Sequence, residues 1–348
     1  MDAIHTVTQY GPGGASARVR VFEWLDHLHL PAVRHTYAGL ASNSVRTLST
    51  RPAATLRAEA SIQRLPARLS SSTLLLSKQA SPFSNGGLER RLLSSAGHAV
   101  YDFDDALFVQ QRGVAGRIFS KRRAWKSAVR AADTVIAGND YLAERASAEL
   151  GGSGRVTVIP SCVDPDDYVA KASYELHDPP AAVWLGSPST EKYLSIVAEP
   201  LLELNARSGL RLTVVSAGDT SLGILDPIVD RERWTPEIQT RLHEWDFGVM
   251  PLTDDEYSRG KCAYKLLQYA AAGLPVVASP FGANAAALDK LDGMRAAGHH
   301  DWVEALIALT QSSEARRLEW GTAARRGVRA YYSYTSWQRC WLATMGLT

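Results

Sequence analysis

The sequence predicts an α/β protein with two parallel-sheet domains that face each other across a cleft, and three observations lead to this prediction. The chain has 348 residues, more than one hydrophobic core usually supports, so two domains are expected. Short apolar runs alternate with helix-like segments, a pattern typical of parallel sheets covered on both faces. This alternation stops at a polar stretch that contains Pro179 and Pro180, and then begins again.

The apolar runs define the expected elements in chain order. In the first half they are Ile4–Val7, Leu74–Leu76, Val100–Phe103, Thr134–Ala137 and Val156–Ile159. In the second half they are Ala182–Leu185, Leu212–Val215, Phe247–Met250 and Pro275–Ala278. We therefore expect a first domain over 1–168, a linker over 169–180, a second domain over 181–330, and a C-terminal helix over 331–348 that packs back towards the first domain. A shared ligand is expected in the cleft, at the carboxyl ends of the strands.

Composition and charge narrow the class of function. The formal net charge is +2, so no global field selects nucleic acid or an acidic membrane, and nucleic acid is not an expected partner. The three cysteines, Cys162, Cys262 and Cys340, show no CxxC spacing, which excludes an ordinary zinc module and indicates a reducing compartment. The sequence shows neither a secretory signal pattern nor a stretch approaching the ~20 apolar residues of a membrane helix. A cytoplasmic enzyme or binding protein is expected.

The segment RGKCAYKLLQYAAAGLPVVASPFGAN, residues 259–284, places cations on an otherwise apolar helix. Lys261, Lys265 and Gln268 stand at i, i+4 and i+7 and form one polar stripe without a carboxylate. Gly273 fits the end of this helix, and a short buried strand follows. Because a helix N-terminus carries partial positive charge, Gly260 and Lys261 are expected to bind a phosphate there. A solvated lysine face is the alternative.

A second cationic helix start follows the first strand of the second domain. In GSPSTEKYL, the accessible N–H groups and hydroxyls come from Gly186, Ser187, Ser189 and Thr190, and Lys192 adds a charge. The spacing is not that of a P-loop. Simple capping of the helix by Ser189 or Thr190 is the alternative. Two cationic helix starts in one cleft favour a diphosphate that both can contact.

The loop YGPGGASARVR follows the first strand. It lacks the third glycine of the dinucleotide fingerprint, where Ser16 stands, and the second strand ends near His35–Tyr37 without an acidic residue, so NAD is not expected. Gly13 and Gly14 allow a ligand to approach the backbone, with Arg18 or Arg20 as cationic contacts. A tight turn with solvated arginines is the alternative.

The stretch VYDFDDALF places Asp102, Asp104 and Asp105 at the end of a central strand. Three adjacent carboxylates repel one another, so they need a metal, cationic partners, substrate hydroxyls or open water. Recognition of sugar hydroxyls, divalent-metal binding, an aspartyl nucleophile and capping of the next helix are the alternatives.

The stretch RIFSKRRAWKSAVR, residues 117–130, carries six cations among apolar residues. Such a helix can lie on an anionic membrane or meet an acidic acceptor, and a solvated helix face is the favoured alternative.

In order and content these motifs, together with VTVIPSCVD, WDFGVMPLTDD and YYSYTSW, resemble the GT-B glycosyltransferases of the GT4-like group over nearly the whole chain. The stretches Val158–Asp164 and Lys261–Asn284 are the most specific. The resemblance implies two Rossmann-like domains and a UDP- or GDP-linked sugar as donor. It also implies an acceptor that is a small molecule, a lipid or a glycan, and transfer with retention of configuration. Neither a metal nor another cofactor is expected.

The resemblance also implies which residues bind the two substrates. The second domain would bind the donor through Gly186, Ser187, Ser189, Thr190, Lys192, Arg259, Gly260, Lys261, Cys262, Ala263, Tyr264, Lys265 and Gln268. The first domain would bind the acceptor through Gly13, Gly14, Arg18, Asp102, Asp104 and Asp105. Catalysis would rest on Lys261 and Lys192, which face the leaving diphosphate, and on Asp105, which contacts the acceptor hydroxyl.

One departure from the family pattern bears on the donor sugar. Family members commonly carry two glutamates eight positions apart, where this chain has Gly260 and Gln268. Gln268 can still bond a ribose hydroxyl, but Gly260 has no side chain to hold the sugar. Recognition of the sugar is therefore expected to move to Asp254, Asp255, Glu256 or Arg259.

Three other functions stay open on the sequence. One is a sugar-nucleotide epimerase or hydrolase on the same fold, the second is a non-catalytic nucleotide-sugar sensor, and the third is a metal enzyme that uses the DxD pattern. The expected location is the cytoplasm, with weak contact at the inner face of the membrane as an alternative.

Overall fold

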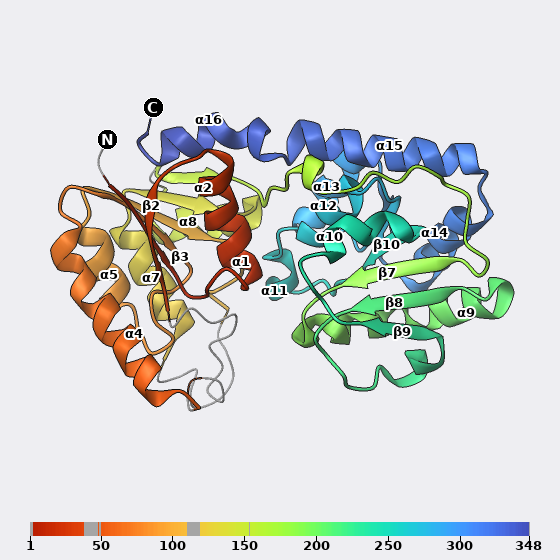
Figure 1. Cartoon of the computed structure of the whole chain (residues 1–348), viewed down its shortest axis with the longest axis horizontal. Helices are drawn as coiled ribbons and strands as arrows, with labels where there is room; N and C mark the ends of the chain where they lie inside the picture. Colours follow the sequence, from red (N-terminus) through yellow and green to blue (C-terminus); the bar gives the residue numbers. More distant parts are fainter. Residues whose placement is uncertain (1–2, 38–47, 49, 110–118, 153, 348) are drawn as a thin grey trace. The chain divides into compact units, whose positions relative to one another are not determined.

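The computed structural model describes residues 3–37, 48, 50–109, 119–152 and 154–347, which form two compact units (Figure 1). Unit 1 comprises Met1–Ser161, Gly260–Cys262 and Trp337–Thr348. Unit 2 comprises Cys162–Arg259 and Ala263–Ser336. Each unit contains a six-stranded sheet whose strands pair in parallel and are flanked by helices. The predicted fold class, two Rossmann-like α/β units, is therefore confirmed.

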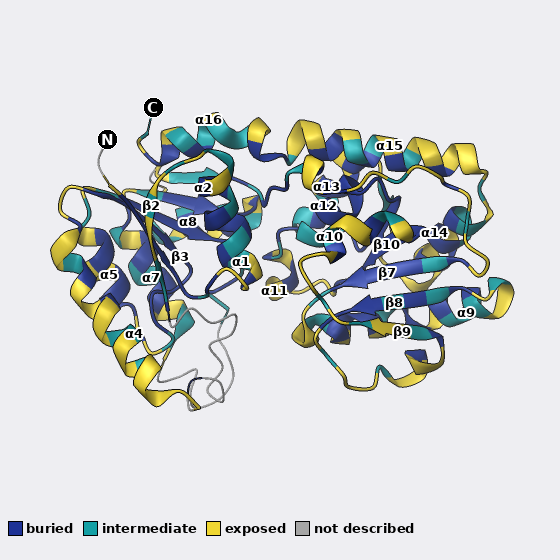
Figure 2. Ribbon diagram, in the orientation of Figure 1, coloured by how far each residue is buried: buried dark blue, intermediate teal, exposed yellow. Residues whose placement is uncertain are grey.

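The sheet of unit 1 has the strand order β2-β1-β3-β4-β5-β6. Its strands are β1 (Ile4–Thr8), β2 (Ala32–Thr36), β3 (Thr73–Ser77), β4 (His98–Phe103), β5 (Thr134–Ala137) and β6 (Val156–Val158). Helices cover both faces of the sheet, so β1 and β3 are buried along their whole length (Figure 2), although β1 also carries His5, Thr6 and Thr8. The polar residues that follow these strands gather at one edge of the sheet.

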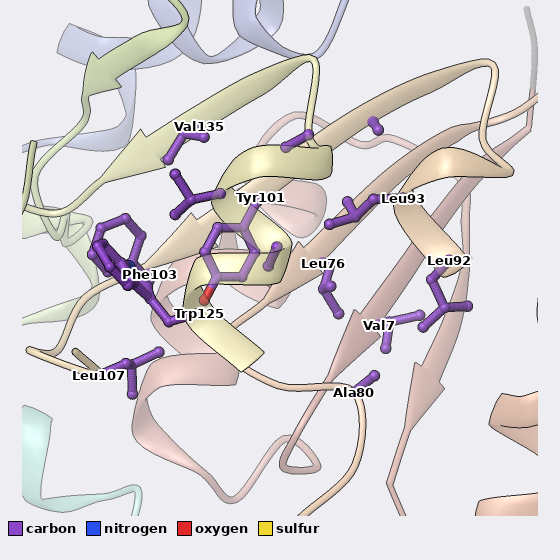
Figure 3. Close-up of a cluster of buried hydrophobic side chains, with 14 of the residues drawn as sticks. Val7, Leu76, Ala80, Leu92, Leu93, Tyr101, Phe103, Leu107, Trp125 and Val135 are labelled. Carbon is purple, nitrogen blue, oxygen red and sulfur yellow. The ribbon is translucent and has the colours of Figure 1, made fainter. Parts of the chain in front are cut away.

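The helices of unit 1 follow the strands in the alternation expected. They are α1 (Ala15–Ala17), a π-helical turn (Arg18–Phe22), α2 (Glu23–His27), α4 (Pro52–Arg64) with a 3₁₀ turn (Leu65–Arg68), α5 (Gly87–Ser94), α7 (Lys121–Ala131) and α8 (Asp140–Glu149). Leu76, Tyr101 and Phe103 of the sheet pack with Leu92 of α5 and Trp125 of α7 in one apolar core (Figure 3). Ordinary burial of such side chains contributes roughly 1.5–3 kcal/mol each.

The sheet of unit 2 has the strand order β12-β11-β10-β7-β8-β9. Its strands are β7 (Ala181–Leu185), β8 (Arg211–Val215), β9 (Val229–Glu232), β10 (Phe247–Met250), β11 (Val276–Ala278) and β12 (Met294–Arg295). Alternate residues of β7 enter opposite cores. Val183 packs on the face that carries α12 (Tyr264–Ala271), and Trp184 packs on the face that carries α9 (Ala198–Ser208) and α14 (His299–Gln311). The two edge strands, β9 and β12, were missed by sequence reasoning because they are short and carry charged residues, as edge strands often do.

The helical segments of unit 2 complete the fold. They are 3₁₀ turns at Pro165–Asp167, Pro188–Val197, Gly223–Ile228 and Leu242–Glu244, and the helices α9 (Ala198–Ser208), α10 (Ile238–Arg241), α11 (Glu256–Arg259), α12 (Tyr264–Ala271), α13 (Ala283–Leu291), α14 (His299–Gln311) and α15 (Glu314–Tyr331). The last helix, α16 (Tyr334–Thr344), continues into unit 1, where Trp341 stacks on Trp24 of α2 with ring centroids 5.3 Å apart.

The unit boundary differs from the linker expected over 169–180. The division falls between Ser161 and Cys162, and residues 169–180 belong to unit 2. Lys171 Nζ donates to the carbonyl of Trp245 at 2.7 Å, and Tyr174 Oη donates to the carbonyl of Gly273 at 2.7 Å. The segment 169–180 is therefore held on unit 2 by side-chain hydrogen bonds. Its composition, with two adjacent prolines, does not distinguish such a segment from a free linker.

Two further observations concern membranes. In the described part of the chain, no helix combines the length and the apolar character that crossing a bilayer requires. The basic segment 117–130 begins outside the described residues, at 117 and 118. From Lys121 onwards it forms α7, which buries Trp125 and Val129 and exposes Arg122 and Arg123, as a solvated helix face does.

Candidate active site

A cluster of charged side chains occupies the carboxyl-end edge of the sheet in unit 1. We call it the aspartate cluster, and it consists of Asp102, Asp104, Asp105, Arg20, Lys78 and Lys261. The strands β1, β3, β4 and β5 are neighbours in the sheet, so the segments that follow them converge at this edge. Each of the three carboxylates has a cationic partner, and these partners offset the repulsion between the adjacent aspartates.

The innermost pair of the cluster is Arg20 with Asp102. Arg20 Nη2 lies 2.5 Å from Asp102 Oδ1, Arg20 Nη1 donates to the Ile159 carbonyl at 2.8 Å, and the two side chains are 1% and 2% exposed. Burial raises the pKa of Asp102, and the charge of Arg20 opposes that shift. Neither side chain is exposed to solvent in this position. This burial favours a scaffold role for both residues over the expected contact of Arg20 with a ligand and of Asp102 with the acceptor.

Lys78 is the central cation of the cluster. Its Nζ lies 2.8 Å from Asp104 Oδ1 and 2.5 Å from Asp105 Oδ2, and it donates to Ser16 Oγ at 2.7 Å. Ser16 Oγ in turn donates to Asp104 Oδ2 at 2.8 Å. Burial alone would lower the pKa of Lys78, but the two carboxylates raise it well above its ordinary value. Lys78 also has a φ of +63°, a left-handed conformation that costs of order 1–3 kcal/mol and that these contacts maintain.

Lys261 and Asp105 form the accessible side of the cluster. Lys261 Nζ donates to Asp105 Oδ1 at 2.7 Å, and the side chains are 21% and 23% exposed. Burial would raise the pKa of Asp105, but the charges of Lys78 and Lys261 lower it far below its usual range. Asp105 is therefore ionised at neutral pH. Lys121 stands near the same charges, and burial followed by repulsion from Lys78 lowers its pKa.

The segment Gly260–Cys262 is seated on unit 1 by close packing. Asn139 Nδ2, from the loop after β5, donates to the Lys261 carbonyl at 3.0 Å. A Cβ on Gly138 would lie 2.5 Å from Cys262 Sγ, and a Cβ on Gly260 would lie 2.7 Å from Ala106 Cβ. Gly260 thus permits close approach of two backbone segments, and this requirement explains why a side chain is absent there.

Unit 2 carries the second group of predicted residues, beginning with the loop after β7. A Cβ on Gly186 would lie 2.1 Å from the ring of Trp184, so only glycine lets the ring fold back beside the loop. Lys265 Nζ lies 4.1 Å from the centroid of that ring. The backbone N–H of Leu185 donates to Tyr269 Oη at 2.7 Å, so the loop is held against α12. Gly186 and Lys265 are therefore brought together, as expected of one site.

The rest of that loop is open to solvent. Ser187 and Ser189 are exposed, and Thr190 Oγ1 donates to the Ser187 carbonyl at 2.9 Å. Lys192 is exposed as well, with its Nζ 5.1 Å from the ring centroid of Tyr193. These residues begin a 3₁₀ helix whose N-cap, Ser187, makes no capping bond through its side chain. Their hydroxyls are thus presented at a helix start, the arrangement expected for contact with an anion.

The predicted polar stripe on α12 needs correction. The helix begins at Tyr264, and its N-cap Ala263 has a φ of +55°, so Lys261 is not a helical residue and does not share a face with Lys265 and Gln268. The left-handed Ala263 breaks the helical path before it reaches Lys261. Gln268 lies in the helix but is only 5% exposed. Gly273, with a φ of +79°, ends the helix as expected.

The acidic residues before α11 have local partners. Arg259 Nε donates to Asp254 Oδ1 at 2.8 Å, and Asp255 Oδ1 accepts from the N–H of Ser258 at 2.8 Å. Asp255 therefore stabilises the start of α11.

On unit 1, Gly13 is exposed and Gly14 is buried. A Cβ on Gly14 would lie 2.5 Å from Tyr10 Cβ, so the position has no room for a side chain. Arg18 forms an ion pair with Glu23 at 3.1 Å.

Sequence reasoning missed Lys78 and Asn139 as members of the site. The only signal in the sequence was position, since Lys78 directly follows β3 and Asn139 is the second residue after β5. Lysines and asparagines after strands are common, so their type alone did not distinguish them from solvated loop residues.

Comparison with known proteins gives a family match for part of the chain and structural neighbours for its fold. Residues 179–312 match the family model of glycosyl transferases group 1. No curated protein sequence matches the chain. WaaG, a glycosyltransferase involved in lipopolysaccharide biosynthesis, is similar in structure with a TM-score of 0.68, 16% identity, and coverage of 99% of this chain and 100% of that chain. HepE from Anabaena, solved in complex with UDP and glucose, has a TM-score of 0.68, 14% identity, and full coverage, 100%, of both chains.

A third structural neighbour is longer than this chain. TarM has a TM-score of 0.62 and 14% identity, and the match covers 82% of this chain but spans only 57% of TarM. At these identities the likenesses establish the fold, which is GT-B. The likenesses define the fold class of this protein as GT-B, and within it residues 179–312 of the second unit match the group 1 glycosyltransferase model.

Proposed function

We propose that the protein transfers a sugar from a UDP- or GDP-linked donor to an acceptor hydroxyl, with retention of configuration and without a metal ion or other cofactor. The observation that carries the proposal is the group 1 match over 179–312, because that range contains the loop of Lys192 and the whole of α12. The presence of UDP and glucose in the HepE complex supports a uridine nucleotide. A TarM variant solved with UDP and α-GlcNAc-glycerol supports a hydroxyl-bearing acceptor.

In this proposal unit 2 binds the donor. The exposed loop Gly186–Thr190 supplies hydroxyls and N–H groups, Lys192 and Lys265 supply charge, and α12 directs its positive end towards the diphosphate. Lys261 precedes that helix by only three residues, and its ammonium is held by Asp105 at 2.7 Å. Charge that develops on the leaving diphosphate would be stabilised by Lys261 and Lys192.

Unit 1 would bind the acceptor beside Gly13, Asp104 and Asp105. Because neighbouring lysines keep the pKa of Asp105 far below neutral pH, its carboxylate is a weak base there. Asp105 would instead accept a hydrogen bond from the reacting hydroxyl and orient it, while the leaving phosphate takes the proton.

The role of Lys261 is tested by Lys261→Ala. A well-aimed donor of this kind contributes roughly 3 kcal/mol to the barrier, so kcat with a UDP-sugar should fall about 100-fold. Lys126→Ala is the matched control, because Lys126 is a lysine of the same unit that is also ion-paired, with Glu149 at 2.9 Å. Folding of both variants is checked by their melting temperatures. A kcat of Lys261→Ala equal to that of the control would remove Lys261 from the mechanism.

Asp105→Asn separates positioning from base catalysis. A loss confined to the KM of the acceptor supports positioning, and a collapse of kcat with an unchanged KM contradicts it. Donor consumption is measured with and without acceptor. Equal donor turnover in both conditions would indicate a hydrolase and would contradict transfer.

A further inference from the structure

A basic groove lies on unit 1, lined by residues of the edge strand β2 and of helix α4. Two adjoining hollows, of about 250 Å³ and about 410 Å³, share His35, Arg57 and Ser61 in their walls. Arg64 and Arg68 complete the smaller hollow. We call this surface the arginine groove. It is separate from the aspartate cluster, because β2 is the edge strand and β4 lies three places further into the sheet, roughly 14 Å away.

The cations of the groove are aligned by the helix. Arg57, Ser61, Arg64 and Arg68 are spaced by four, three and four residues along α4 and the turn that follows it, so they share one face. Arg64 and Arg68 stand four residues apart, and like charges at this spacing repel and destabilise a helix. A bound anion would neutralise these arginines and would remove the repulsion that destabilises the helix.

In the part of the chain that the structure describes, the guanidinium groups of Arg57, Arg64 and Arg68 form no ion pair and no hydrogen bond, whereas Arg34, in the wall of the larger hollow, pairs with Asp26. The nearest acidic residue on the helix, Glu59, accepts instead from Ser81 Oγ at 2.6 Å and from Gln63 Nε2 at 2.9 Å. The guanidinium groups of the groove therefore keep their donors available.

The sequence around the groove is depleted of carboxylates. From position 27 to position 88 there are seven lysines and arginines and one carboxylate, Glu59, which gives a net charge of +6. The whole chain carries only +2, so the remainder is net negative. Of these seven cations, Lys78 belongs to the aspartate cluster and Arg34 pairs with Asp26, so the positive charge of the groove comes from Arg57, Arg64 and Arg68.

His35 adds a neutral donor to the groove. Its Nε2 lies 3.0 Å from His5 Nδ1, and the two rings stack with centroids 5.3 Å apart. Burial, followed by the charges of His5 and Arg68, lowers the pKa of His35. His35 is therefore uncharged at neutral pH, and its protonation reports on any anion that enters the groove.

We propose that the arginine groove is an oxyanion site for a phosphate group. Guanidinium forks match the geometry of phosphate oxygens, and the Ser61 hydroxyl can donate a further bond. Phosphate is favoured over a single carboxylate because three cations around a hollow of about 250 Å³ are better neutralised by a dianion. The phosphate can belong to a soluble phosphate ester or to a lipid headgroup. The site does not depend on the proposed sugar transfer.

The test compares the intact protein with a groove variant, Arg57→Gln/Arg64→Gln/Arg68→Gln. Glutamine has a helix propensity close to that of arginine, so α4 should remain folded. The control, Arg90→Gln/Arg316→Gln/Arg326→Gln, removes the same charge from exposed helical positions outside the groove. Calorimetry with inorganic phosphate and sedimentation with phosphatidylglycerol or phosphatidylcholine vesicles give the affinities.

Saturable binding of phosphate that weakens at least tenfold in the groove variant, and not in the control, supports the proposal for a soluble phosphate ester. Binding of phosphatidylglycerol vesicles alone, with the same dependence on the groove arginines, supports it for a lipid headgroup.

A second readout uses the unaltered protein. Phosphate should raise the pKa of His35 in an NMR titration, because a nearby anion favours the imidazolium. The proposal is overturned if neither inorganic phosphate nor phosphatidylglycerol vesicles bind, or if the control variant loses binding as much as the groove variant does.

Discussion

The pair of Arg20 and Asp102 lies at the base of the aspartate cluster, and its removal tests whether these residues form a scaffold. Their side chains are 1% and 2% exposed and 2.5 Å apart. With Arg20 replaced by methionine, Asp102 would keep only the hydroxyl of Ser77, at 3.3 Å. An ionised carboxylate buried with one neutral partner is strongly unfavourable.

The expected magnitude follows from this geometry. Loss of one partner of a buried ion pair costs about 3–5 kcal/mol, so Arg20→Met should lower the free energy of unfolding by that amount. The double variant Arg20→Met/Asp102→Leu removes both charges. It leaves the Ile159 carbonyl and the Ser77 hydroxyl without their present partners, at a cost of about 1–3 kcal/mol. The double variant should therefore be more stable than Arg20→Met alone.

Urea unfolding followed by circular dichroism measures these differences. Arg18→Met is the matched control, because Arg18 is two residues away and its ion pair with Glu23 is partly exposed, at 18% and 28%. Its effect should stay below about 1 kcal/mol. If Arg20→Met matched this control, or if the double variant were less stable than Arg20→Met, the assignment of the pair to a buried scaffold would be refuted.

Three further predictions concern local packing and pH. Gly260→Ala forces a Cβ to within 2.7 Å of Ala106, so its free energy of unfolding should fall by about 1–3 kcal/mol in urea titrations, and an unchanged value would show that the segment can move aside. Gly186→Ala places a Cβ 2.1 Å from the Trp184 ring, and displacement of that ring should weaken binding of a UDP-sugar in calorimetry, whereas unchanged affinity would separate the loop from the donor site. Because the pKa of folded Asp105 lies below its unfolded value of about 3.9, its ion pairs stabilise the protein above about pH 4 and are lost as the pH falls further. The stability difference between wild type and Asp105→Asn should thus shrink below pH 4 in urea titrations, and a constant difference down to pH 2 would contradict the shift.

The sequence by itself determined the α/β architecture and most of its strands. The predicted runs Thr134–Ala137 and Phe247–Met250 coincide with β5 and β10, because a strand buried on both faces must be apolar along its length. Gly273 correctly predicted the end of α12, because the chain takes a left-handed backbone conformation there, which favours glycine. Such features depend on residues that are close together in the chain, so they can be predicted from the sequence alone.

Only the tertiary structure decided how the charged residues pair. Asp102 meets Arg20 from 82 residues away, and Asp105 meets Lys261 from 156 residues away. Residue type indicates that a carboxylate needs a partner, but it does not specify which cation reaches it. The assignment of Lys261 to the surface of unit 1 also depends on the left-handed Ala263 and on the close fit of Gly260 against Ala106. Pairing across such separations is set by the packing of strands and loops in space, because the aligned carboxyl ends of a parallel sheet bring distant segments to one edge.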